Sequence, residues 1–196
     1  MSFNVPSKVA ERLQTGIKKF QTILASAKSR DCNESDTSTI VSDMLAEIFG
    51  YDKYSEITSE LAIRGTYCDL AIKLDGKLVL LLEVKAIGLE LKEAHTKQAI
   101  DYAANQGVEW VILTNGIHWH IYHIIFGQPI EQELVYNFNF LDLNHKTDDD
   151  VESIYLLTKE GQSKFALEDF HSQRQVMNRF FISAILDSEA VLSVLR

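Results

Sequence analysis

The chain has 196 residues, a net charge of −9 at pH 7 and two cysteines, a length that allows one compact domain with a full hydrophobic core. Its apolar runs fall well short of the roughly 20 residues that a membrane-spanning helix needs. No apolar segment typical of a signal peptide follows Met1. We therefore expect a cytoplasmic protein with reduced thiols and no membrane partner.

The negative charge is concentrated in the second half of the chain. Residues 1–100 hold 13 basic and 14 acidic side chains, whereas residues 101–196 hold 6 and 14. This balance argues against tight, non-specific coating of a nucleic acid, because phosphate binders carry an excess of Lys and Arg. It does not exclude a nuclease, since a pocket that collects metal cations is built from carboxylates.

Two helices are predicted in the N-terminal part. Apolar residues at spacings of three and four predict an amphipathic helix over residues 6–28; they are Val9, Leu13, Ile17, Phe20 and Leu24. A polar stretch over residues 30–36 interrupts the pattern. A second helix follows, with a buried stripe between Ile40 and Ile48, and Gly50 is suited to a left-handed C-cap beyond it. The basic side chains of the first helix could contact DNA phosphates or form a solvated face.

Strands and helices then alternate. Three strand-like segments are predicted over about residues 54–62, 67–74 and 77–86. The last two flank Asp75-Gly76, which is a strong hairpin signal. A helix is predicted over residues 91–105, with Gly107 at its end.

The remaining elements complete an α/β pattern. Strands are predicted over residues 110–114, 117–126 and 133–138, a linker over residues 144–150, and helices over residues 151–195. This order predicts an α/β fold with a mixed central sheet flanked by helices. We divide the chain into an N-terminal helix (1–30), a core (31–143) and a C-terminal helical extension (144–196).

The strand over residues 77–86 carries the first candidate pair. Glu83 and Lys85 project from the same face, because side chains alternate along a strand. Five consecutive apolar residues precede them, which indicates a central strand that is covered on both faces. A charged pair at the end of such a strand is costly to bury unless it has partners or a ligand. Taken alone, Glu-x-Lys is more simply explained as an ordinary ion pair.

Asp69 lies on the preceding strand, and its position relative to Glu83 depends on the register of the hairpin. If the loop has two residues and the strands pair regularly, Asp69 lies opposite Leu82 and faces away from Glu83. An odd-length loop or a β-bulge returns Asp69 to the face of Glu83. A metal site requires this second register. Otherwise Asp69 caps a loop or pairs with Arg64.

These residues meet the needs of phosphodiester hydrolysis. A divalent cation offsets the charge of the phosphate, lowers the pKa of bound water and stabilises the developing oxyanion. The carboxylates of Asp69 and Glu83, with the Val84 carbonyl as an extra ligand, suit Mg2+, with Mn2+ as a substitute. Lys85 would hold the nucleophilic water or the transition-state oxyanion.

Gln98 and Tyr102 are supporting candidates. They lie four residues apart and therefore share one face of the predicted helix over residues 91–105. In isolation the pair is typical of an exposed glutamine beside a half-buried tyrosine. After an Asp…Glu-x-Lys hairpin, we expect Gln98 and Tyr102 to orient Lys85 or to contact the backbone of the substrate.

These residues fall in the order and spacing of a known family. The chain resembles the N-terminal nuclease domain of type I restriction enzyme R subunits and the related type IV restriction endonucleases, within the PD-(D/E)xK nuclease superfamily. The matching segments are Asn33-Glu34-x-x-Thr37, Phe49-Gly50-Tyr51-Asp52, Asp69, Leu82-Glu83-Val84-Lys85 with Ile87-Gly88, His95-x-x-Gln98-x-x-x-Tyr102 and Ile112-Leu113-Thr114-Asn115-Gly116. Two positions depart from the pattern: Cys68 stands where the superfamily's name has proline, and Leu70 where an aromatic residue is frequent.

The resemblance implies a restriction-endonuclease-like fold, dependence on Mg2+, and DNA as the substrate within a restriction system that has further subunits or domains. It also implies that Glu34 is an additional acidic residue near the metal. The chain contains no Walker A motif and is not expected to hydrolyse ATP by that route. Cleavage of both DNA strands would favour a homodimer. The alternative function is a non-catalytic nuclease-fold module for DNA binding or subunit assembly.

Two other clusters could bind metal. His118 and His120 share a face of one predicted strand and could bind a transition metal, together with the nearby His123. No third ligand from elsewhere is evident, so a solvated strand face is the better interpretation. The run at 148–150 consists of three aspartates, which are more typical of a helix N-terminus than of a metal site.

Overall fold

The computed structural model describes residues 4–63 and 66–186 and confirms an α/β fold with a mixed sheet flanked by helices. Two helices precede the sheet, α1 (Ser7–Ser29) and α2 (Glu34–Glu47). The strands are β1 (Ile57–Ile63), β2 (Thr66–Leu74), β3 (Lys77–Val84), β4 (Trp110–Thr114), β5 (His118–Ile125) and β6 (Glu131–Asn139). The other helices are η1 (Glu93–Thr96), α3 (Lys97–Gln106), η2 (Phe140–Asp142), α4 (Asp148–Tyr155), α5 (Lys159–Gln162) and α6 (Ala166–Leu186).

The six strands lie in sequence order in one sheet. Neighbouring strands are antiparallel except β3 and β4, which are parallel. A parallel pair needs a crossover connection, and here the connection runs through η1 and α3. The carboxyl end of β3, which carries Glu83 and is followed by Lys85, therefore lies in the middle of the sheet beside the end of β4.

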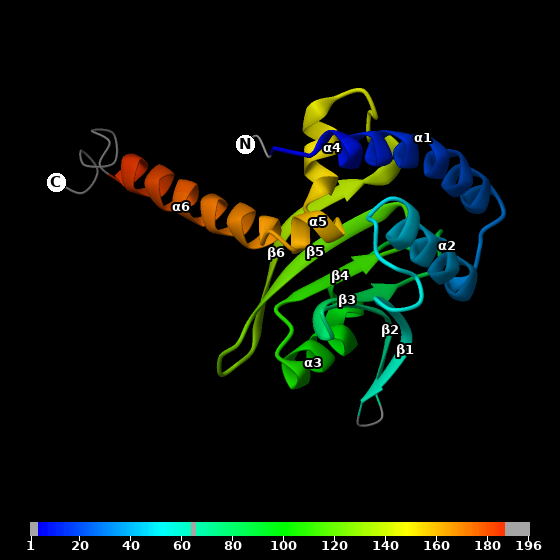
Figure 1. The fold of residues 1–196 in the computed structure, drawn as a ribbon. Coiled ribbons are helices and arrows are strands. Elements are labelled where there is room, and N and C mark those ends of the chain that lie inside the picture. The colour runs from blue at the N-terminus through cyan, green and yellow to red at the C-terminus, as the bar shows by residue number, and fades with distance from the viewer. Residues whose placement is uncertain (1–3, 64–65, 187–196) are drawn as a thin grey trace.

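Helices cover both faces of the sheet. Figure 1 shows α1, α2 and α4 on one side and α3 on the other. The larger core, on the side of α1 and α2, includes Leu70 and Leu82, whereas the smaller core under α3 includes Ala71 and Leu81. Successive residues of β2 and β3 are thus buried on opposite faces, which explains their continuous apolar sequence.

Local sequence signals set the start of α2 and the ends of α2 and α3 close to their predicted positions, whereas the helix predicted from residue 91 begins as the 3-10 helix η1 at Glu93 and becomes α-helical at Lys97. The Asn33 side chain accepts a hydrogen bond from the Asp36 backbone N–H at 2.9 Å and caps α2. Gly50 and Gly107 have positive φ angles of 84° and 67°. Gly107 is the left-handed C-cap of α3, and Gly50 ends the turn that follows α2, as a residue without Cβ readily does.

The C-terminal helices pack against the N-terminal helix. The Arg12 guanidinium donates to both carboxylate oxygens of Glu160, at 2.9 and 2.6 Å, and to the Ile48 carbonyl at 2.9 Å. The larger core includes residues from all three predicted parts of the chain. The division at residues 30 and 143 stays a prediction, but one hydrophobic core joins the parts on either side.

The predicted end of the linker at residue 150 is wrong, because α4 begins at Asp148. Its first turn contains three aspartates, whose negative charges are stabilised by the positive end of the helix dipole. This position confirms that the acidic run belongs to a helix N-terminus.

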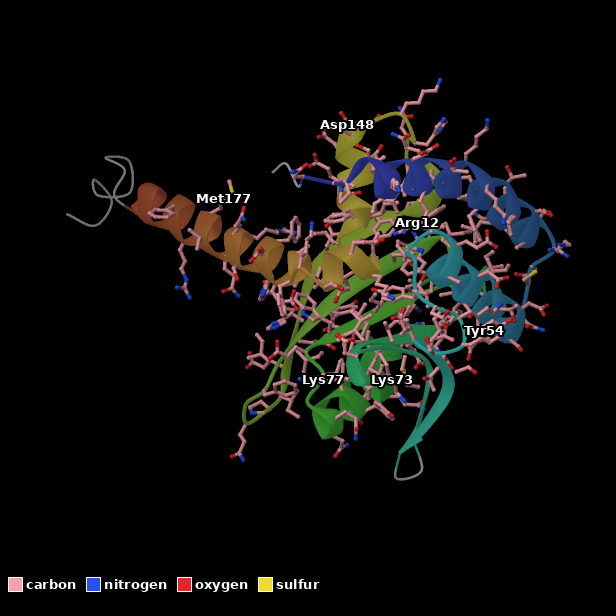
Figure 2. All side chains as sticks on the ribbon, viewed as in Figure 1. Arg12, Tyr54, Lys73, Lys77, Asp148 and Met177 are labelled. Carbon is pink, nitrogen blue, oxygen red and sulfur yellow. The ribbon has the colours of Figure 1, made fainter. Side chains whose placement is uncertain are left out.

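The helix α6 extends away from the sheet (Figure 1). At its first turn, Trp110 on β4 donates to Glu168 at 3.0 Å. Further along, Met177 and Phe180 are exposed, and Figure 2 shows Met177 on the part of α6 that lies beyond the sheet. Among the helices of the described residues, none combines the length and the apolar composition needed to cross a bilayer.

Candidate active site

The turn between β2 and β3 is a tight one. Asp75 and Gly76 have positive φ angles of 50° and 76°, and the first pair of the ladder directly flanks them. The loop therefore contains two residues, in agreement with the hairpin signal. A regular ladder from this turn would point Asp69 away from Glu83.

A β-bulge at Val79 changes the register. Ile72 pairs with Leu80 rather than with Val79, and the ladder then continues to the pair Leu70–Leu82. One extra residue on β3 thus shifts all later pairs by one position, which exchanges the faces to which the side chains point. The register that a metal site requires is present, and a bulge rather than a longer loop produces it.

Asp69 and Glu83 occupy the next position on each strand. Because side chains alternate along a strand, Asp69 points to the same face as Ala71, and Glu83 points to the same face as Leu81. Ala71 and Leu81 belong to the smaller core under α3. Beyond the last ladder pair, Asp69 Oδ2 accepts the backbone N–H of Val84 at 2.7 Å. The Asp69 carboxylate is thereby held against the central strand.

Lys85 connects the two other candidate carboxylates. Its Nζ donates to Glu83 Oε1 at 2.6 Å and to Glu34 Oε2 at 3.4 Å. Glu34 is the first residue of α2, which packs on the larger core. The N-terminus of α2 therefore lies at this edge of the sheet. The predicted group of Glu34, Asp69, Glu83 and Lys85 is brought together from three elements.

Glu83 is the most deeply buried of these charged groups. Its side chain is 6% exposed, and Oε2 is buried without a hydrogen-bond partner among the described residues. A buried carboxylate oxygen without a partner is costly. It therefore marks a position where a cation would be stabilising.

The environment shifts the pKa values of Glu83 and Lys85. Burial raises the pKa of Glu83, and the nearby charges of Asp69 and Glu34 add to this effect, while the hydrogen bond from Lys85 opposes it. For Lys85, burial alone would lower the pKa, but the hydrogen bond and charge of Glu83, with Glu34 and Asp69, raise it. Lys85 is thus held as a cation. With three carboxylates around one ammonium, the ionised group has a net negative charge.

A depression of about 530 Å³ opens beside Glu83 and Lys85. Gln98 lies in its wall, together with His95 and Lys97. The residues predicted from sequence do not include Lys97, although its position directly before Gln98 at the start of α3 is a usable signal. His95 belongs to the sequence motif His95-x-x-Gln98-x-x-x-Tyr102. The structure shows that His95 also lines the depression.

Tyr102 is not among the residues that line this depression. It is buried in the smaller core, and its hydroxyl has no hydrogen-bond partner among the described residues. Burial raises the pKa of Tyr102, with a smaller contribution from the neighbouring Cys68. Gln98 and Tyr102 therefore occupy different environments, one at the depression and the other between α3 and the sheet.

The donor groups fit a hard divalent cation. Carboxylate oxygens from Asp69 and Glu83 are the ligands that Mg2+ accepts in proteins, and the cation retains several waters. Within residues 4–63 and 66–186, no three His, Cys, Asp or Glu side chains are arranged to hold a metal ion. Both carboxylates have protein partners, because Lys85 donates to Glu83 Oε1 and the Val84 N–H donates to Asp69 Oδ2. The role of the Val84 carbonyl as a ligand stays a prediction.

The candidate histidines do not form one cluster. His118 and His120 line another depression, described below. His123 instead contacts Trp110 and His171, with ring centroids 4.8 and 4.4 Å away.

The mixed sheet, with an aspartate on β2 and Glu-x-Lys at the end of β3, has the arrangement that defines the PD-(D/E)xK class. Residues 39–135 match the family model of the type I restriction enzyme R protein N terminus (HSDR_N). The chain is similar to that family through this segment, which contains Asp69, Glu83, Lys85 and Gln98. Comparison with curated proteins and with solved structures gave no match.

Proposed function

We propose that this protein is a Mg2+-dependent endodeoxyribonuclease domain of a restriction system. The observation that carries the proposal is the convergence of Asp69, Glu83 and Lys85, which depends on the bulge at Val79. The similarity of residues 39–135 to the type I restriction enzyme R protein N terminus supports a role in restriction. The same similarity supports DNA and further restriction subunits as partners.

In this proposal, Asp69 and Glu83 bind the cation, and Glu34 adds negative charge from the N-terminus of α2. Magnesium, when bound, would lower the pKa of a water and offset the charge of the scissile phosphate. Lys85 would keep Glu34 as a partner if Glu83 held the cation, and its ammonium would orient the water or stabilise the oxyanion. Gln98 binds a phosphate oxygen or orients Lys85 from the wall of the depression.

Tyr102 has a different part in this scheme. Its buried position makes it a support for α3, which carries Gln98, rather than a group that touches the substrate. We therefore assign Tyr102 a positioning role. Cleavage of both DNA strands would need two such sites, which favours a homodimer on DNA.

Plasmid cleavage tests the proposal directly. Supercoiled plasmid is incubated with the protein and Mg2+ or Mn2+, alongside D69N, E83Q and K85Q. A matched control is K77Q, because Lys77 is an exposed lysine at the start of the same strand (Figure 2). Cleavage by the wild type and by K77Q, lost in the three other variants, supports the enzyme. Cleavage that persists in all variants contradicts it.

One set of contacts favours the non-catalytic alternative. Asp69 and Glu83 already have protein partners, namely the Val84 N–H and the Lys85 ammonium. A module of this fold that binds DNA or another subunit without cutting would keep such contacts. DNA binding by the wild type, with no cleavage in either metal, would favour this function.

A further inference from the structure

The candidate catalytic edge of the sheet extends across β4 to β5. Because β3 and β4 are parallel and β5 is antiparallel to β4, the ends of β3 and β4 and the start of β5 lie at one edge. Lys85 follows β3, Asn115 follows β4 and His118 begins β5. His118 and Lys85 therefore lie at the same edge although 33 positions separate them in sequence.

The strand register also places His120 on the face of Glu83. Glu83 pairs with Leu113, and Leu113 pairs with His120. Residues that pair across strands point to the same face, so Glu83 and His120 both face α3. Neighbouring strands lie about 4.8 Å apart, so two strand spacings separate their backbones by about 10 Å. His118 is two residues from His120 and points to the same side.

A second depression, of about 410 Å³, lies at this edge. His118 and His120 line it, together with Lys28 from the last turn of α1. Within the described residues, neither imidazole has a hydrogen-bond partner, and the Lys28 ammonium forms no ion pair. By contrast, the Asn115 amide in the same wall donates to the Ile87 and Leu89 carbonyls.

The chemistry of the available groups matches an anion rather than a metal ion. Two imidazoles and an ammonium supply N–H donors, and Glu90 is the only acid among the residues of this wall. Each strand of duplex DNA carries one phosphate for every 3.4 Å of the helix axis. A duplex bound at Lys85 therefore presents further phosphates within the roughly 10 Å that separate the two parts of this edge.

We propose that His118, His120 and Lys28 form a second contact site for the DNA sugar-phosphate backbone, two strands away from the catalytic group. This inference rests on the proposed nuclease function and adds a binding site to it. The three side chains position the duplex across the sheet edge and take no part in the chemical step. Sequence discrimination is not expected from them, because contacts to phosphates carry no base information.

DNA binding tests the site separately from cleavage. Fluorescence anisotropy is measured with a short fluorescein-labelled DNA duplex in Ca2+, which also binds carboxylates. We expect H118A/H120A to bind about tenfold more weakly, since hydrogen bonds to a charged phosphate are lost. K28Q should lower the slope of log affinity against log salt by about one. K18Q is the matched control, because Lys18 is an exposed lysine on the same helix about 15 Å away.

The outcomes separate this site from the catalytic proposal. At protein concentrations below Kd, H118A/H120A should cleave plasmid more slowly in proportion to its weaker binding, whereas K85Q should not cleave at any concentration. If the wild type binds and cleaves but H118A/H120A and K28Q bind within twofold of it, the second site is overturned and the nuclease stands. If the wild type neither binds nor cleaves DNA, both proposals fail. H118A alone, at an exposed position, decides the matter if the double variant unfolds.

Discussion

Asp69 Oδ2 accepts the backbone N–H of Val84 at 2.7 Å, where the ladder between β2 and β3 has ended. A side chain thus takes the place of a backbone acceptor at the end of the central strand. This contact satisfies a donor that burial would otherwise leave without a partner. The contact also holds the Asp69 carboxylate beside Glu83. The negative charge of Asp69 helps to raise the pKa of Glu83.

Magnesium is expected to stabilise the protein against thermal unfolding. At a concentration of 100 times Kd, binding contributes about 2.7 kcal/mol, which corresponds to a rise in Tm of roughly 5–10 °C for a chain of this size. D69N and E83Q should lose most of this rise because each removes a ligand charge. Differential scanning fluorimetry with Mg2+ and with EDTA measures it.

D75N is the matched control for this experiment. Asp75 is an exposed carboxylate on the same hairpin and lies in the turn rather than at the site. It should keep the full rise in Tm. Equal rises in the wild type, D69N and E83Q would show that the metal binds elsewhere.

The pKa of Glu83 predicts how metal binding depends on pH. Burial raises this pKa, so protons compete with the metal at a higher pH than for an ordinary glutamate. The Mg2+-dependent rise in Tm should therefore fall as the pH decreases through the raised pKa of Glu83. A profile that falls only at the pKa of an exposed glutamate would be inconsistent with this carboxylate as a ligand.

Without metal, the same pKa shift has the opposite consequence for folding. A raised folded-state pKa means that the contribution of Glu83 to stability is fully present below its unfolded pKa. That contribution is lost as the pH rises through the folded pKa. In EDTA, the Tm of E83Q relative to that of the wild type should therefore increase with pH across this window. Paired melting curves measure this difference in Tm. A difference that is constant with pH would exclude this contribution of Glu83 to the pH dependence of stability.

Lys85 should contribute to the rate of cleavage. K85Q removes the ammonium that would face the scissile phosphate in the proposed function, and losing one preorganised electrostatic group costs about 10²–10³ in rate. Plasmid nicking under single-turnover conditions measures the effect, with K77Q as the control. A K85Q rate within a few-fold of the wild-type rate would remove Lys85 from the mechanism.

The contact between α1 and α5 should contribute measurably to stability. Arg12 makes two charge-assisted hydrogen bonds to Glu160 and one to the Ile48 carbonyl. R12A is expected to lower the free energy of unfolding by about 1–3 kcal/mol. Urea denaturation measures the change, and K18A on the exposed face of the same helix should be neutral. A neutral R12A would mean that this contact is worth no more than an exposed ion pair.

Much of the architecture is predictable from local sequence. Spacing of apolar residues predicts α1 and α2, because a helical period of 3.6 leaves a clear stripe. The Asp75-Gly76 turn and the shared face of Glu83 and Lys85 follow from residue types and from alternation. The family resemblance adds Glu34, which the fold brings within 3.4 Å of Lys85.

The packing of α3 was not predictable to the same degree. Gln98 and Tyr102 are correctly assigned to one helix, but their spacing does not reveal which of them is buried. That depends on how α3 lies over the sheet, where Tyr102 enters the smaller core and Gln98 reaches the depression. The alignment of Glu83, Leu113 and His120 on neighbouring strands likewise depends on the strand order, which local sequence does not specify.

The position of Asp69 shows most clearly what sequence alone determines. The residues from Leu78 to Leu82 are all apolar, so alternation does not reveal which of them face α1 and which face α3. The sequence determines that the strand is buried and that acidic residues stand at its end. Only the tertiary structure decides the register, because packing on both faces selects the bulge at Val79 that turns Asp69 toward Glu83.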